Sequence, residues 1–366
     1  MLKRSFGVVA VTAAAALLLA ACSSGSDTAA SEDTAAAAAS GLACVILPDS
    51  ASSPRWENGD RPALKEALEA AGFTTDIQNA EGDTAKMLTI GDQMLASGCN
   101  VMIITDFKGA GAQVAAKSKA QGVPTIAYDR PIEGVDYYVS FDNVTVGTLQ
   151  GEGIIKCLGD AGKDPKTAQL IFLDGDPTDG NAAMFAEGYD TALKAAGVEV
   201  DKAKLGAKRP DGSWDGAKAG TNFEQALTAN GGKVDAVVSA NDTNAAAAIA
   251  ILDKNKLTVP VSGQDASKEG MNNVLSGKQC MTVFKDYLVE ASTAADLAIA
   301  ILKGETPTTN KQLADGTPFQ AADPQALYAD AASLDGFKQA LDRSGLTAAD
   351  VCTGDAAAKC TEIGLS

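Results

Sequence analysis

An adjacent acid and base, Asp129 and Arg130, directly follow the short apolar run 123–128. The run is typical of a buried parallel strand, and Gly122 before it is typical of a helix end. In open α/β sheets, ligands sit beyond the carboxyl ends of the strands, which is where these two side chains would stand. A carboxylate accepts hydrogen bonds and a guanidinium donates several, so the pair suits a small neutral molecule with many hydroxyls. A solvated ion pair at a strand end is the alternative.

The same pattern recurs in the second half of the chain. Asn241 and Asp242 follow one apolar run, and Asp265 follows the next one along the sequence. Asp242 is expected to cap the helix that begins after it, whereas Asn241 and Asp265 are expected to face the ligand. Lys285 ends the run 281–284 and adds a hydrogen-bond donor.

Aromatic and amide side chains complete the candidate set. The two tryptophans, Trp56 and Trp214, both stand in polar loops, whereas a core tryptophan normally belongs to an apolar pattern. A loop tryptophan can offer a flat apolar wall to the C–H face of a sugar ring. Arg55 adds a cation beside Trp56. Asn181 begins a helix that also carries Phe185, which is expected in the core, with ligand contact as the alternative.

The elements that must position these residues alternate between strand and helix along the whole chain. Their strands are continuous apolar runs, which is typical of a doubly wound parallel sheet, and the alternation occurs twice. The fold class is therefore α/β, with two doubly wound lobes and a ligand cleft between them. The chain is expected to cross between lobes near Asp142, Lys285 and Thr317, which makes a multi-strand hinge. The expected divisions are 42–141 with 286–316 for the first lobe, 142–285 with 317–345 for the second, and 346–366 for a tail.

The amino terminus indicates export. Lys3 and Arg4 precede an apolar stretch too short for a confident membrane span, and small residues then lead to Cys22. This segment resembles a lipoprotein signal peptide at 1–21, with lipid on Cys22; an ordinary signal peptide is the alternative. Residues 22–41 are small or polar and are expected to form a disordered tether. We therefore expect a protein held on the outer face of the cell membrane by lipid only.

The net charge and the absence of histidine limit the partners and the chemistry that can be expected. The formal net charge is −17, and it becomes −19 once Lys3 and Arg4 are removed, which argues against nucleic acid as a partner. The sequence has no histidine, so the commonest general base and metal ligand is missing. No metal site and no cofactor are expected.

Six cysteines remain beyond Cys22, and an even number in an exported chain indicates disulfides. Cys44 and Cys99 each open an apolar run and could meet on neighbouring strands. Cys352 and Cys360 lie close together in the tail. Cys157 and Cys280 then remain as the third pair.

Six short strings occur in order along the chain: AYDR at 127–130, VSFDN at 139–143, ALTAN at 226–230, VDAVVSAND at 234–242, SGQDA at 262–266 and MTVFK at 281–285. With them, roughly residues 44–345 resemble the type I periplasmic sugar-binding proteins of ABC importers, the D-xylose-binding proteins in particular. The resemblance implies a monomer that captures a monosaccharide by lobe closure and delivers it to ABC permease subunits. It implies ligand contacts at Arg55, Trp56, Asp129, Arg130, Asn181, Trp214, Asn241, Asp265 and Lys285, with Asp142 and Asn143 at the hinge or behind the site. The six cysteines depart from the family pattern.

Three other functions are alternatives to transport: a glycosidase, a sugar sensor and a repressor. A glycosidase would use Asp129 and Asp265 as its carboxylates, but Arg130 and Lys285 are expected to keep them ionised, whereas an acid catalyst needs a raised pKa. A sensor that presents its sugar to a membrane receptor has the same sequence features as a transport protein. The export signal and the lack of a DNA-binding helix pair before Cys44 argue against a repressor of this fold.

Overall fold

The computed structural model describes residues 41–365 except 51, 52 and 54. The expected signal peptide, the expected lipidation site Cys22 and all of the expected tether but Gly41 lie outside the described residues. Within the described part, no helix has the length and apolar character that crossing a membrane requires.

The first lobe is built on a seven-stranded sheet in the order β2-β1-β3-β4-β5-β10-β9. All neighbouring pairs are parallel except β10 with β9. Its strands are β1 (Leu42–Leu47), β2 (Thr74–Asn79), β3 (Val101–Ile104), β4 (Thr125–Tyr128), β5 (Tyr137–Phe141), β9 (Lys311–Gln312) and β10 (Pro318–Ala322).

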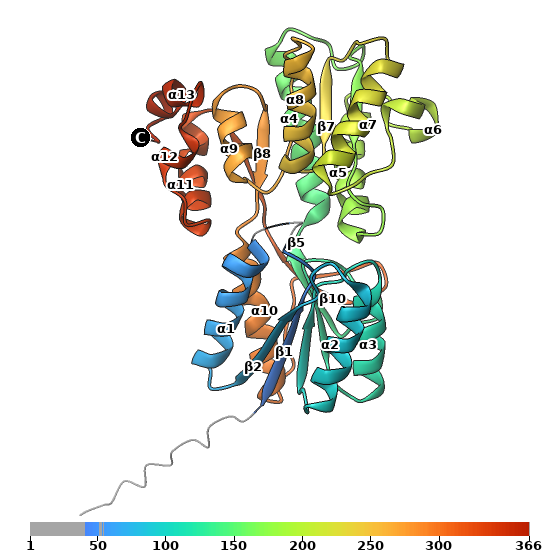
Figure 1. Cartoon of the computed structure of the whole chain (residues 1–366), viewed down its shortest axis with the longest axis vertical. Helices are drawn as coiled ribbons and strands as arrows, with labels where there is room; N and C mark the ends of the chain where they lie inside the picture. The colour runs from blue at the N-terminus through green and yellow to red at the C-terminus, as the bar shows by residue number, and fades with distance from the viewer. Residues whose placement is uncertain (1–40, 51–52, 54, 366) are drawn as a thin grey trace, which may run out of the picture. The chain divides into compact units, whose positions relative to one another are not determined.

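Helices cover both faces of this sheet, as the continuous apolar runs predict. Alternate side chains of β1 enter two different cores, with Cys44 and Ile46 in one and Val45 and Leu47 in the other. The first core includes side chains of α2 (Thr84–Ala96) and α3 (Ala110–Ala120), and the second includes side chains of α1 (Arg61–Ala70) and α10 (Tyr287–Leu302) (Figure 1).

The second lobe repeats the arrangement with shorter pairings. Strands β6 (Leu170–Leu173) and β7 (Ala236–Ser239) are parallel, and β8 (Met281–Phe284) pairs antiparallel with β11 (Gln325–Tyr328). Bridges from Val261 to Val237 and from Gln264 to Val283 join the two pairs. The run 259–263, which the sequence predicts as a strand, therefore lies between β7 and β8 as an irregular linking segment.

The helices of the second lobe surround these strands, and the carboxyl-terminal helices pack onto α9 through one apolar core. Figure 1 shows them beside β8. The helices are α4 (Asn143–Asp160), α5 (Gly180–Ala195), α6 (Lys202–Leu205), α7 (Gly216–Ala229), α8 (Asp242–Lys254), α9 (Lys268–Leu275), α11 (Leu334–Arg343), α12 (Ala348–Val351) and α13 (Ala356–Ile363). Short turns of other helix types lie at η1 (Trp56–Asp60), η2 (Gly206–Lys208) and η3 (Ala331–Ser333).

The chain passes between the two sets of strands three times. It leaves β5 for α4 at Asp142, and it returns from β8 to α10 through Lys285. The third passage follows Ala322, since β10 still pairs with β5 in the first sheet while β11 pairs with β8. This is later than the crossing expected near Thr317, because 318–322 completes the first sheet before the chain leaves it.

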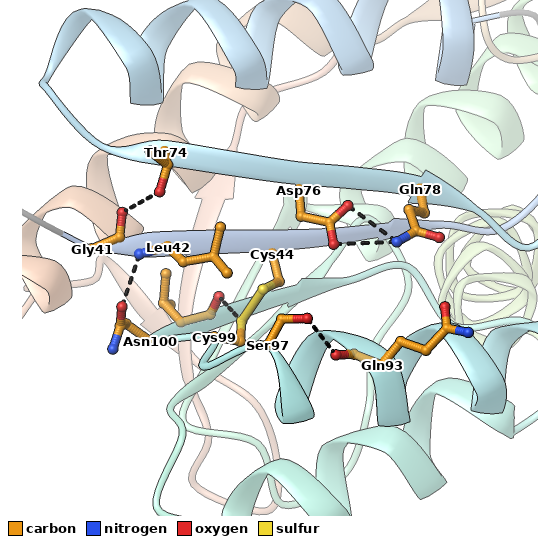
Figure 2. The surroundings of a disulfide bond; sticks show 11 residues. Gly41, Leu42, Cys44, Thr74, Asp76, Gln78, Gln93, Ser97, Cys99 and Asn100 are labelled. Atoms are coloured by element: carbon orange, nitrogen blue, oxygen red, sulfur yellow. Dashed lines mark hydrogen bonds between the residues drawn. A yellow bond between two sulfur atoms is a disulfide. The ribbon is translucent and has the colours of Figure 1, made fainter.

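Three disulfides join the pairs that the sequence predicts: Cys44 with Cys99, Cys157 with Cys280, and Cys352 with Cys360. The first ties β1 to the turn that enters β3. In Figure 2 the disulfide lies near two hydrogen bonds between side chain and backbone at the start of β1: Leu42 N–H donates to Asn100 Oδ1 at 2.8 Å, and Thr74 Oγ1 donates to the Gly41 carbonyl at 3.0 Å. These contacts fix the amino-terminal end of β1.

Candidate ligand-binding site

A small cavity of about 60 Å³ lies where the carboxyl ends of the strands of both lobes meet. All nine residues that the sequence singles out for ligand contact line it. Its lining is Ser53, Arg55, Trp56, Asp129, Arg130, Asp179, Asn181, Phe185, Trp214, Asn241, Gln264, Asp265 and Lys285. The cavity is far smaller than the roughly 300–1,000 Å³ of sites for drug-sized ligands, so it suits a single small molecule.

Asp129 and Asp265 hold unusual backbone conformations at the ends of their strands. Their φ angles are 63° and 104°, a region that few residues other than glycine adopt. The backbone N–H of Asp129 donates to the Val139 carbonyl at 2.9 Å, and that of Asp265 donates to the Val283 carbonyl at 2.8 Å. These sheet bonds hold the chain through the turn, so both carboxylates are presented to the cavity. Such strain concentrates at functional sites, where the surrounding structure maintains it.

Arg55 is held by three carboxylates. Its Nε and Nη2 donate to Asp60 at 3.0 and 3.1 Å, Nη2 donates to Glu290 at 2.7 Å, and Nη2 lies 3.2 Å from Asp129 Oδ2. Asp60 also accepts a hydrogen bond from the Tyr128 hydroxyl. Because the guanidinium plane also lies over the Trp56 ring at 4.3 Å, its orientation toward the cavity is tightly determined.

Glu290, one turn into α10, has no solvent exposure, and burial raises its pKa to about 8 although Arg55 opposes the shift. A carboxyl group that is this deeply buried favours its neutral form. Burial therefore favours the protonated form of the acid behind Arg55, so we expect the network to respond to pH.

Asp265 and Lys285 form a looser pair across the cavity floor, with Nζ and Oδ1 3.8 Å apart. The Asp265 side chain is 39% exposed, and Lys285 is buried over the rings of Phe141 and Phe185. Enclosure between the lobes raises the pKa of Asp265, and Lys285 and Arg55 offset this only in part. The neighbouring cations therefore oppose the rise in the pKa of Asp265 without reversing it.

Asn181 connects the cavity to the crossing between lobes at residues 142–143. Its Nδ2 donates to the Asp129 carbonyl at 3.0 Å, and its Oδ1 accepts from Asn143 Nδ2 at 2.9 Å and from the Tyr138 hydroxyl at 3.2 Å. Asn143 is buried at the first residue of α4, and Asp142 caps that helix and pairs with Lys311. A ligand that moves Asn181 would therefore disturb the residues at the crossing between lobes.

The two tryptophans face the cavity from opposite lobes. Trp56 is buried and stands edge-on to Tyr128, with ring centroids 6.5 Å apart. Trp214 is half-buried, stands edge-on to Phe185 at 6.3 Å, and donates from Nε1 to Asp179 at 3.1 Å. Phe185 combines the two roles considered for it, since it belongs to the second lobe's core and also lines the cavity.

The capping role expected of Asp242 belongs to Asn241. Asn241 Oδ1 accepts from the Asn244 N–H at 2.9 Å. The side chain of Asn241 can therefore offer its amide N–H groups to the cavity. Asp242 begins α8 and is buried beneath the site, where it accepts from Gln279, Thr282 and the Ser267 N–H. Burial raises its pKa to about 7. The expectation was one residue out, because only the preceding residue has the extended backbone of a cap.

Sequence reasoning missed several residues of this site. Asp179, Gln264 and Ser53 line the cavity, and Asp60 and Glu290 hold Arg55. Asp179 lies among several polar groups of one loop, and Glu290 begins an apolar helix where an acid is commonly a favourable end charge. Of these missed residues, only Gln264 could have been found from the sequence, because it directly precedes Asp265 at the end of a predicted strand. Among the described residues, no group of three acidic or cysteine side chains could hold a metal ion.

The sequence profile of the periplasmic binding protein domain matches residues 44–306. The chain belongs to the family of periplasmic binding proteins. This is a family of exported proteins that bind ligands without catalysing a reaction, so the chain is a binding protein and not an enzyme. The expected resemblance to periplasmic binding proteins and the expectation of a protein without enzymatic activity are therefore both confirmed.

The chain is 32% identical over 273 residues to the D-xylose-binding periplasmic protein of Escherichia coli, which covers 73% of this chain and 80% of that one. It is 34% identical to a multiple sugar-binding periplasmic protein of Azospirillum brasilense, over 74% and 80% of the two chains. Among solved structures, an ABC transporter solute-binding protein of Clostridium phytofermentans with bound β-D-glucose is 30% identical, with a TM-score of 0.70 over 83% of this chain and 97% of that one. The type I fold with two lobes is thereby confirmed.

Proposed function

We propose that this protein captures a monosaccharide, with D-xylose as the first candidate, and delivers it to the permease of an ABC importer. One observation carries the proposal: a single cavity collects the carboxylates, amides, cations and both tryptophans that a polyhydroxylated ring requires. The relatives named for D-xylose and for multiple sugars, and the neighbour with bound glucose, support a sugar as the ligand class.

The polar groups suit sugar hydroxyls, which both donate and accept. Asp129 and Asp265 would accept from hydroxyls, and Arg130 and Lys285 would donate to them. Charge-assisted hydrogen bonds contribute about 1.5–3 kcal/mol each before ordering costs, so a few reach the roughly −8 kcal/mol of micromolar binding. The indoles of Trp56 and Trp214 would cover the apolar faces of the ring.

Binding would stabilise a closed arrangement of the lobes. Both lobes contribute contacts, so the closed state offers the ligand more of them than an open state, and the ligand shifts the population toward closure. We propose that the hinge is formed by the three passages between lobes, at Asp142, at Lys285 and after Ala322. The closed form would dock on the permease.

The anchoring and location are also part of the proposal. The short apolar segment and Cys22 support a lipoprotein signal at 1–21, lipid on Cys22, and a tether that keeps a monomeric protein close to its permease on the outer face of the membrane. Mass spectrometry of the membrane-extracted protein tests this, since a diacylglyceryl group on an amino-terminal Cys22 is expected and an unmodified amino terminus would contradict it.

Tryptophan fluorescence during titration with a panel of pentoses and hexoses tests the sugar assignment. Both tryptophans of the chain line the cavity, so the signal reports on this site. We expect a saturable change with D-xylose that Asp265→Ala abolishes. No response to any monosaccharide, from a sample that unfolds cooperatively, would contradict the proposal.

A further inference from the structure

A second and larger hollow adjoins the small cavity. This outer cleft has a volume of about 490 Å³ and lies between loops of both lobes, with Phe107 and Lys108 on one side and Asp215 and Thr243 on the other. The cavity and the outer cleft share three lining residues, Arg130, Asp179 and Trp214. These three side chains therefore form the wall between the two spaces.

Asp179 is the central member of this wall. One carboxylate oxygen lies 3.2 Å from Arg130 Nε and accepts from Trp214 Nε1 at 3.1 Å. The other accepts from the Asn181 N–H at 2.9 Å, so Asp179 also caps α5. Its side chain is 8% exposed, and burial raises its pKa against the attraction of Arg130. Asp179 thus links a cation of the first lobe to an indole of the second.

The wall is closely packed against the backbone on both sides. A Cβ atom placed on Gly180 would lie 2.6 Å from Pro131 Cγ, and one placed on Gly175 would lie 2.0 Å from Trp214 Cη2. Residues 129–131 of the first lobe thus meet residues 179–181 of the second without a gap. A substituent on a ring in the cavity could reach the outer cleft only by displacing the wall.

We propose that Asp179 is a specificity-determining residue that limits the ligand to a single sugar ring by closing the wall between the cavity and the outer cleft. The inference rests on the proposed function. The outer cleft has room for a second ring, and its lining carries more acids than bases, which suits a neutral glycoside better than a phosphorylated sugar. What excludes such ligands is the wall and not the space beyond it.

The test variant is Asp179→Ser. Serine is as good a cap as aspartate, so α5 keeps its amino-terminal hydrogen bond, while the shorter side chain cannot reach Arg130 and Trp214. Asp215→Ser is the matched control. Asp215 also caps a helix, α7, and it lines the outer cleft without lining the cavity.

Calorimetric titration with the preferred monosaccharide and with its β-linked disaccharide measures the affinity ratio for each protein. We expect the unchanged protein and Asp215→Ser to prefer the monosaccharide strongly, and Asp179→Ser to lower that preference at least about tenfold. Trp214→Ala opens the same wall and keeps the aspartate cap of α5, but Trp214 also lines the cavity, so this variant counts through the gain in disaccharide affinity that it should show whether or not Asp179→Ser folds. An unchanged ratio in the folded wall variants, or equal affinity for both ligands in the unchanged protein, would overturn the inference alone. Failure of every monosaccharide to bind would overturn the proposed function and this inference with it.

Discussion

Asp129 offers the sharpest test of how the cavity holds its ligand. Replacing it with asparagine keeps the shape, tolerates the positive φ of 63° and removes the charge. Replacing it with alanine also removes the hydrogen bond. A charge-assisted hydrogen bond contributes about 1.5–3 kcal/mol and a neutral one about 0.5–1.5 kcal/mol. We therefore expect Asp129→Asn to weaken sugar binding about tenfold, and Asp129→Ala to weaken it about 10- to 150-fold.

The alanine variant should also lose stability, because alanine at a positive φ costs about 1 kcal/mol. Lys256→Ala is the control for alanine at a positive φ outside the cavity: Lys256 is exposed, has a φ of 55° and already carries a Cβ atom without the local hydrogen bonding of aspartate, so this substitution should change stability little. Urea unfolding measures the loss of stability, and calorimetry measures the loss of sugar binding, so the two effects of Asp129→Ala are separated. If Asp129→Ala lost stability and still bound sugar as the unchanged protein does, Asp129 would be a strained structural residue and the reasoning would be refuted.

Three further predictions concern stability and recognition. Burial raises the pKa of Glu290 to about 8, so the folded protein holds a proton that the unfolded chain has released above about pH 4.5. The free energy of unfolding should therefore fall as pH rises between these values, and Glu290→Gln should make the urea midpoint fall less over this range; an identical pH profile would contradict the assignment. Replacing Cys157 and Cys280 with serine removes a link across 123 residues of sequence and should lower the free energy of unfolding by about 2–5 kcal/mol, with sugar affinity kept. An unchanged urea midpoint would show that the bond adds nothing. Lys285→Met keeps the aliphatic stem over Phe185 and removes the donor, so binding should weaken about 10-fold or more in calorimetry while the fold persists; wild-type affinity would exclude Lys285 as a contact.

The sequence by itself determined the class of fold and most of the cavity. Asp129, Asn241, Asp265 and Lys285 each follow an apolar run, and parallel strands place their carboxyl ends at one edge of a sheet. Local order along the chain was therefore enough to bring these side chains together. Two cysteine pairs followed from apolar runs and from short separation, and the third pair, Cys157 with Cys280, was what remained.

Only the tertiary structure decided the residues that depend on contacts between distant segments. Asp179 closes the cavity because Arg130 of the other lobe and Trp214 of a separate loop both reach it. Glu290 supports Arg55 across 235 residues of sequence. No pattern distinguishes such acids from solvated ones, because their role comes from burial against a partner that local sequence does not specify.

The remaining differences are those of boundaries. Asn241 rather than Asp242 caps α8 because the backbone enters the helix one residue earlier than composition indicates. The last passage between lobes waits until after Ala322 because β10 completes the first sheet. The sequence determined which elements and polar strand ends exist, whereas pairing and close packing between elements decided where each one stops and which side chains it presents.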